Sequence, residues 1–216
     1  MLKFTLLKGG LGGCAPCCMK GRKTVLGVLM MNTGTPDAPT PEAIRPYLKQ
    51  FLSDRNIIHA PRFIWYPVLN LCILPNRPKK TAPNYQAFWT KEGSPFLLTS
   101  LAQRDKLRVR LTELAGEPVA VELGMRYGNP SVASALDALF DAGVDHIVAL
   151  SMYPQDTKAC AGTCLEEFDR SLEAALAVRS VAARPTVDKI AYYWNAPGYL
   201  DALAQSVREA WSYEPG

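Results

Sequence analysis

The chain has no apolar run of the ~18–20 residues that a helix needs to cross a bilayer, so no transmembrane helix is expected. The nearest approach is Phe63–Leu74, which is shorter and is interrupted by Pro67 and Asn70. Three interpretations of this stretch stay open: a hydrophobic lip over a pocket, an edge that touches a membrane surface, and a core helix that begins at Pro67. Membrane contact is therefore expected to be peripheral at most.

The six cysteines form no disulfide framework. Three of them lie between residues 14 and 18, and the other three are dispersed along the chain. This usage favours a reducing compartment, and we expect a cytoplasmic protein.

The body of the chain also has no excess of charge. Five of the 24 basic residues and none of the 20 acidic residues lie in residues 1–23, so the remainder carries 19 basic against 20 acidic side chains. A near-neutral body has no electrostatic footprint for nucleic acid, and no nucleic-acid partner is expected. Residues 1–23 show no periodic apolar face and are predicted to be a disordered leader.

What the sequence does contain is a strand–loop–helix pattern that recurs along the chain. Val25–Met31 is an almost unbroken apolar run, typical of a strand that is buried on both faces of a parallel sheet. The run stops at the small and polar residues Asn32–Pro36, which are predicted to form a loop. Thr40 and Pro41 then suit the N-cap and first turn of a helix.

The copies of this pattern predict an α/β fold with a doubly wound parallel sheet, strand order 2-1-3-4, joined by right-handed crossovers. The region His59–Pro83 is rich in proline and is predicted to be irregular or weakly helical. The expected strands are Val25–Met31, Val119–Met125, His146–Met152 and Lys189–Trp194, and the expected helices are Pro41–Leu52, Asn84–Trp89, Ser100–Ala115, Ser131–Ala142, Thr163–Ala177 and Pro197–Trp211.

Polar and aromatic side chains follow the first three predicted strands, whose carboxyl ends should converge on one edge of the sheet. Tyrosines, one arginine, hydroxyls and amides would suit a flat, partly aromatic ligand that bears carboxylates. A nucleotide is poorly supported, because the loops contain no Gly-x-Gly-x-x-Gly or Walker motif. The alternative is that these are ordinary loop residues that cap helices and face water. The residues are Asn32, Thr33 and Thr35; Arg126, Tyr127 and Asn129; and Tyr153, Gln155 and Thr157.

Five ordered motifs carry a resemblance to a known family: M-N-T-G-T-P-D-A-P-T-P-E-A-I-R-P-Y-L-K-Q-F-L-S-D, I-L-P-N-R-P-K-K-T-A, F-W-T-K-E-G-S-P, G-M-R-Y-G-N-P-S-V and Y-P-Q-D. In these motifs, and over about Val25 to Trp211, the sequence resembles the ferrochelatases, including the bacterial protoporphyrin and coproporphyrin enzymes. The resemblance implies insertion of ferrous iron into a porphyrin during haem synthesis. It also implies two similar doubly wound lobes, of which residues 24–194 would be the first and residues 195–216 a helix leading toward the second.

The resemblance also implies the substrate-binding residues. Thr33 matches a position beside the porphyrin metal where relatives place Met, Leu or Tyr, and threonine gives no reason to expect a metal ligand.

Asp156 stands where an aromatic residue is usual, and the spacing of Cys160 and Cys164 does not reproduce the iron–sulfur cluster pattern of some relatives. No resident cofactor is expected, and ferrous iron is a substrate. Tyr85, Ser94, Arg126 and Tyr127 match positions that line the porphyrin or hold its propionates, and Tyr153 and Gln155 match the loop after the third strand.

No catalytic residue is expected in this chain. Metallation removes two pyrrole protons and needs a base, which the family supplies from a histidine and a glutamate in the second lobe. The sequence ends at Gly216 before either motif, and His59 and His146 lie outside matching contexts. Three hypotheses follow. The first is the N-terminal half of a ferrochelatase, from a truncated sequence, a decayed gene, or a split gene with a separately encoded C-terminal lobe. The second is a non-catalytic porphyrin-binding or partner-dependent module, and the third is an α/β lobe whose site residues no longer act. The expected substrates are Fe²⁺ with protoporphyrin IX or coproporphyrin III.

Overall fold

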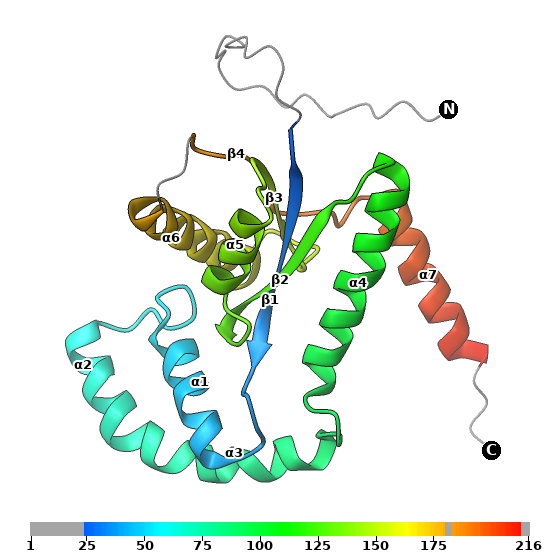
Figure 1. Cartoon of the computed structure of the whole chain (residues 1–216). Helices are drawn as coiled ribbons and strands as arrows, with labels where there is room; N and C mark the ends of the chain where they lie inside the picture. Colours follow the sequence, from blue (N-terminus) through cyan, green and yellow to red (C-terminus); the bar gives the residue numbers. More distant parts are fainter. Residues whose placement is uncertain (1–23, 180–182, 213–216) are drawn as a thin grey trace.

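The computed structural model describes residues 24–179 and 183–212, so the predicted disordered leader, residues 1–23, lies outside the described residues. It contains a four-stranded parallel sheet with the strand order β2-β1-β3-β4, which confirms the predicted fold class and order (Figure 1). The first strand lies inside the sheet, between its two neighbours. The strands are β1 (Leu26–Thr35), β2 (Ala120–Gly128), β3 (His146–Ser151) and β4 (Thr186–Ile190).

Helical segments connect and cover these strands. Among the described residues, no helix is both long and apolar enough to cross a membrane. The helices are α1 (Pro41–Ser53), α2 (Arg62–Pro67), the π-helix η1 (Val68–Ile73), α3 (Leu74–Phe88), α4 (Pro95–Ala115), α5 (Val132–Asp141), the π-helix η2 (Lys158–Gly162), α6 (Thr163–Val178) and α7 (Pro197–Ser212).

Both faces of β1 are buried, as its apolar run predicts. Leu29 and Met31 point to the core that α5 and α6 form on one face of the sheet. Val28 and Met30 point to the opposite face, which α4 covers through apolar side chains such as Leu101. The alternation of side chains along the strand therefore fixes which helix layer each residue contacts.

A third apolar cluster lies outside the sheet, where α1 packs against η1 and α3. Ile44 and Leu48 of α1 are buried with Leu69 of η1 and Leu74 of α3. The Trp65 indole N–H of α2 also donates to the carbonyl oxygen of Leu52 at 2.7 Å. This cluster attaches the α2–η1–α3 run to the rest of the molecule.

The region predicted as irregular or weakly helical is helical from Arg62 to Phe88, so its irregular alternative is wrong. The predicted short helix Asn84–Trp89 forms the last part of α3, which ends at Phe88. Proline inside a helix removes a backbone hydrogen bond. The chain accommodates Pro67 at the end of α2, where the π-helix begins, and keeps Pro78 and Pro83 inside α3. Burial of apolar side chains in the third cluster offsets that cost.

The ends of three strands and the start of one helix also differ from prediction. The strands β1 and β2 continue through the polar residues that were predicted as loops, because their backbones keep pairing as far as Thr35 and Gly128. The fourth strand ends at Ile190, since the N–H groups of Tyr193 and Trp194 donate to Pro154 instead of extending the ladder. The helix α4 begins at Pro95, with proline in its first turn.

The longer β1 depends on Gly34. Its φ of +107° lies in the region that L side chains rarely adopt, and a Cβ there would approach the Tyr127 carbonyl oxygen to 1.8 Å. Only glycine allows β1 and β2 to approach each other at this point. The polar end of the strand therefore remains paired.

Candidate functional site

The carboxyl ends of β1, β2 and β3 meet at one edge of the sheet, and the residues predicted for substrate binding come from segments at this edge. Thr33 is half-buried near the end of β1. Ser94 precedes α4, and its hydroxyl lies 3.0 Å from the hydroxyl of Thr35, so α4 begins beside the end of β1. A parallel sheet places its ligand sites at this edge.

A tyrosine that the sequence analysis missed, Tyr47 of α1, links several of these residues. Its hydroxyl donates to the carbonyl oxygen of Gly34 at 3.4 Å, and its ring stacks with Phe51 at a centroid distance of 6.3 Å. Burial raises the pKa of Tyr47 far above its usual value, and the neighbouring Tyr85 adds to this shift. The signal was present in the sequence, because Tyr47 lies three residues after the buried Ile44 and so flanks the apolar face of α1.

Tyr85 and Tyr153 complete a group of half-buried phenols around Tyr47. Burial also raises the pKa of Tyr85 and that of Tyr153, and charges on Cys164, Cys160 and Tyr47 would raise the latter further. The three phenols therefore stay neutral at physiological pH. They offer aromatic faces and hydroxyl donors at this edge of the sheet.

A pocket of about 380 Å³ opens at the carboxyl ends of β1 and β2. Ser94 lies in its wall, together with Pro36 and Asp37 after β1 and Asn129 after β2. The Asn129 amide donates to both carboxylate oxygens of Asp37, at 3.0 and 3.1 Å, and joins the two strand ends. The predicted residue Ser94 thus lies at a hollow, although its own side chain is buried.

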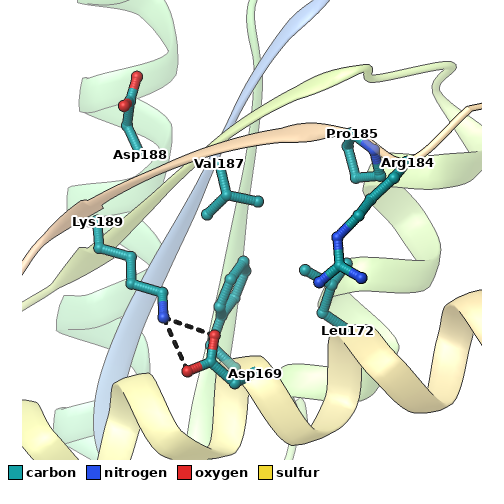
Figure 2. A pocket seen from close by; sticks show the side chains of 8 residues that line it. Asp169, Leu172, Arg184, Pro185, Val187, Asp188 and Lys189 are labelled. Carbon is teal, nitrogen blue, oxygen red and sulfur yellow. Dashed lines mark hydrogen bonds and ion pairs between the residues drawn. The ribbon is translucent and has the colours of Figure 1, made fainter. Parts of the chain in front are cut away.

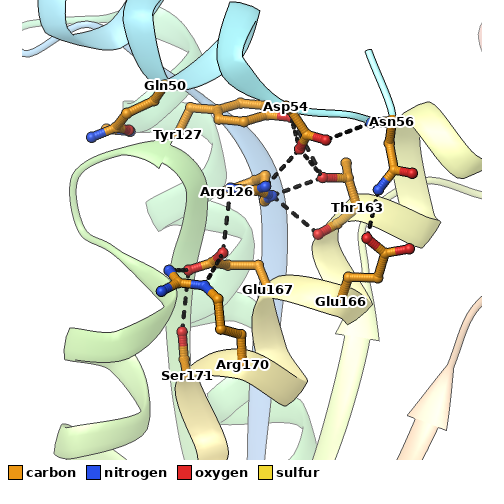
Figure 3. A network of polar contacts seen from close by, with 11 residues as sticks. Gln50, Asp54, Asn56, Arg126, Tyr127, Thr163, Glu166, Glu167, Arg170 and Ser171 are labelled. Carbon is orange, nitrogen blue, oxygen red and sulfur yellow. Dashed lines mark hydrogen bonds and ion pairs between the residues drawn. The ribbon is translucent and has the colours of Figure 1, made fainter. Parts of the chain in front are cut away.

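Arg126 and Tyr127 point into a buried polar network rather than into this pocket (Figure 3). The centre of the network is Asp54, at the C-terminus of α1. Its carboxylate accepts from the Arg126 guanidinium at 2.5 Å, from the Tyr127 hydroxyl at 2.7 Å and from the Thr163 hydroxyl at 2.5 Å. Burial opposes ionisation of Asp54, but the hydrogen bonds from Thr163, the Asn56 N–H and Tyr127, with the charge of Arg126, hold its pKa below the usual value.

Each nitrogen of the Arg126 guanidinium has an acceptor within the protein. Nε donates to the carbonyl and hydroxyl oxygens of Thr163, and Nη1 lies 3.4 Å from a carboxylate oxygen of Glu167. Tyr127 is 1% exposed. Direct contact of Arg126 and Tyr127 with a substrate therefore stays a prediction. In the structure these two residues connect the C-terminus of α1, the end of β2 and the start of α6.

The loop after β3 carries the remaining predicted residues. Gln155 and Asp156 are exposed, whereas the ring of Tyr153 packs against the core beside Cys164. Burial raises the pKa of Cys164 to about 12, so this thiol stays protonated. Within the described ranges, no group of three or more His, Cys, Asp or Glu side chains is placed to hold a metal ion.

The two histidines differ in position. His146 begins β3 at the opposite edge of the sheet, where its Nε2 lies 2.8 Å from a carboxylate oxygen of Asp188. His59 is exposed in the segment between α1 and α2.

A second hollow, of about 450 Å³, lies between β4 and α6 and contains none of the predicted residues (Figure 2). Its cations are already paired: Lys189 contacts Asp169 at 2.6 Å, and Arg184 contacts Glu173. The carboxyl edge is therefore the better candidate site.

The chain is similar to known proteins of one family. The family model described as Ferrochelatase matches residues 25–215. The chain is 43% identical over 187 residues to a ferrochelatase of Chromobacterium violaceum, covering 87% of this chain and 50% of that protein. It is 43% identical over 191 residues to one of Thioalkalivibrio sulfidiphilus, covering 88% and 50%, and 44% identical over 183 residues to one of Alcanivorax borkumensis, covering 85% and 52%.

The chain spans about half the length of the curated relatives it matches. The family match covers every strand and helix described above, including the segments that meet at the carboxyl edge. The chain therefore belongs to the ferrochelatase family.

Proposed function

We propose that this chain forms the porphyrin-binding lobe of a ferrochelatase, which inserts ferrous iron into protoporphyrin IX or coproporphyrin III during haem synthesis. The observation that carries the proposal is the gathering of neutral phenols and hydroxyls at the carboxyl edge of the sheet, in a chain of this family. The proposal places the reaction in the cytoplasm. It includes no resident cofactor, because iron enters as a substrate.

The chemistry of this edge suits a flat macrocycle with acidic side groups. The rings of Tyr47, Tyr85 and Tyr153 supply apolar surface for the macrocycle, and their hydroxyls can donate to propionate carboxylates. A phenol with a raised pKa keeps its proton and does not repel a carboxylate. Thr33 would lie close to the centre of the ring, and Ser94 and Gln155 would lie at its margin.

Metal insertion also needs groups that accept the two pyrrole protons within hydrogen-bond reach of the ring. His146 lies at the opposite edge of the sheet and His59 is exposed in the connection between α1 and α2, so the proposal assigns proton acceptance to a second lobe. A candidate contact surface for that lobe is α7, which buries none of its own side chains. Its apolar residues Leu200, Leu203, Val207 and Trp211 are 41–82% exposed.

The position of the histidines also favours a second candidate function, a non-catalytic porphyrin-binding module. Both candidates predict that the purified chain binds porphyrin, and they differ in whether a second lobe adds catalysis. Titration of protoporphyrin IX or coproporphyrin III, followed by absorbance and fluorescence, should give saturable binding. The Tyr85→Phe variant keeps the ring and loses the hydroxyl donor, so it should bind about 3–10-fold more weakly.

The control variant is Tyr66→Phe, which removes an exposed hydroxyl on α2, a helix that contributes none of the proposed site residues, and it should leave porphyrin binding unchanged. An anaerobic assay with ferrous iron should show no turnover by the chain alone and turnover after a separately expressed second lobe is added. Binding without any turnover in the mixture would select the non-catalytic module. Absence of saturable binding would refute both.

A further inference from the structure

The segment that follows β4 lies against the loop that follows β3. The backbone N–H groups of Tyr193 and Trp194 both donate to the carbonyl oxygen of Pro154, at 3.0 Å each. The Tyr193 hydroxyl also donates to the carbonyl oxygen of Met152 at 2.7 Å, and its ring meets the edge of the Tyr199 ring at a centroid distance of 5.4 Å. These contacts fix the backbone of Trp194 beside the carboxyl ends of β3 and β4.

The Trp194 side chain is largely open to solvent at this place. Its exposed fraction is 53%, although tryptophan carries one of the largest apolar surfaces of any side chain. Pro154 directly follows Tyr153, one of the three phenols of the candidate site, so the backbone of Trp194 lies at the margin of that site. An exposed indole offers a flat apolar face and one N–H donor, which suits contact with a planar aromatic ligand.

The strand order separates Trp194 from the hollow that contains Ser94. The order is β2-β1-β3-β4, and the hollow lies at the ends of β1 and β2. Trp194 lies at the ends of β3 and β4, on the other half of the carboxyl edge. Protoporphyrin IX is itself two-sided, because its two propionates lie on one half of the macrocycle and its two vinyl groups lie on the other half.

We infer that Trp194 contacts the vinyl-bearing half of the porphyrin and so orients the ring with its propionates toward the ends of β1 and β2. This contact rests on the proposed function, because it belongs to the same site. Propionates need hydrogen-bond donors, which the Tyr47 and Tyr85 phenols and the Ser94 hydroxyl can supply. Vinyl groups need only apolar surface, and covering them with the indole removes apolar area from water. Each half of the macrocycle then meets side chains of matching polarity.

The test is a pair of titrations of the full chain, one with protoporphyrin IX and one with deuteroporphyrin IX, in which hydrogen replaces both vinyl groups. Trp194→Ala should weaken protoporphyrin binding about 3–10-fold, because an aromatic contact is lost together with the apolar area that it covers. The same change should weaken deuteroporphyrin binding less than about twofold, because that ligand lacks the groups that the indole contacts. Trp194→Phe keeps an aromatic face and should restore most of the affinity for protoporphyrin.

The matched control is Leu114→Ala, which removes an apolar side chain that is 60% exposed in the last turn of α4. Since α4 ends shortly before β2 begins, Leu114 lies toward the opposite edge of the sheet, and both affinities should stay unchanged. Thermal unfolding of each variant checks that the fold is kept.

Equal losses for the two porphyrins would overturn the inference, because a purely structural role of Trp194 does not distinguish the ligands. Unchanged protoporphyrin binding by Trp194→Ala would also overturn it and would leave the proposed function standing. Absence of saturable binding by the unchanged chain would refute the proposed function itself, and the Trp194 contact with it.

Discussion

Replacing Asp54 with asparagine tests the buried network at the end of α1. The change keeps the shape of the side chain and removes the charge that faces the Arg126 guanidinium at 2.5 Å. It also takes an acceptor from the Tyr127 and Thr163 hydroxyls, which donate at 2.7 and 2.5 Å. Removing one partner of a buried ion pair costs about 3–5 kcal/mol. Because the remaining amide oxygen can still accept one bond, we expect a loss of about 2–3 kcal/mol in the free energy of unfolding.

The same change should alter the pH dependence of stability. The pKa of Asp54 is held below its unfolded value, so its ionised form stabilises the fold above about pH 4, and that contribution is lost as the pH falls through the folded pKa. The deficit of Asp54→Asn should therefore be largest near neutral pH and should shrink in acid.

Urea unfolding followed by circular dichroism and tryptophan fluorescence, at neutral pH and at successively lower pH, measures both effects. A matched control is Asp156→Asn, which removes an exposed carboxylate and should change stability by less than about 0.5 kcal/mol. A deficit that stays constant across this pH range would refute the assignment of the stabilisation to the Asp54 carboxylate. An asparagine variant as stable as the unchanged chain would refute the network argument entirely.

Three further changes test the packing and the site. Gly34→Ala places a Cβ 1.8 Å from the Tyr127 carbonyl oxygen at a φ of +107°, so it should cost more than about 3 kcal/mol or prevent folding, and a normal urea midpoint would contradict this. Leu69→Ala should cost about 2–5 kcal/mol because this side chain is fully buried, whereas Leu71→Ala, 75% exposed, should cost less than about 0.5 kcal/mol; equal losses would contradict the third cluster. Ser94→Ala should weaken porphyrin binding about 3–10-fold in the absorbance titration, and unchanged affinity would remove Ser94 from the proposed site.

The run Val25–Met31 was sufficient to predict a strand buried on both faces, because local apolar composition reports burial directly. Its end was not predictable in the same way. Asn32 and Thr35 are polar, and pairing with Met125 and Gly128 of β2 keeps them in the strand. Pairing with a strand that lies far along the chain cannot be predicted from the residues of β1 alone.

The full extent of the helical run through the prolines was not predicted, for a related reason. Proline disfavours a helix locally, and the compensation comes from burial of Leu69 and Leu74 against α1, which a local pattern does not show. The Asp54 network was equally hidden, since Arg126 and Thr163 lie far from Asp54 in the sequence. The resemblance named Arg126 as a site residue but gave no sign that its donors are already engaged.

The position of β1 inside the sheet has a consequence for synthesis of the chain. Gly27 pairs with Ala120 and Leu26 pairs with His146, so the earliest strand to leave the ribosome receives its neighbours only after most of the lobe has been translated. Until then both backbone edges of β1 have no native partner, and neither does the apolar face that α5 and α6 cover. Parallel pairing of this kind is slow and leaves nascent chains open to aggregation. Slow synthesis or a shortage of chaperones while the α1–α4 segment is being made should therefore lower the yield of folded protein.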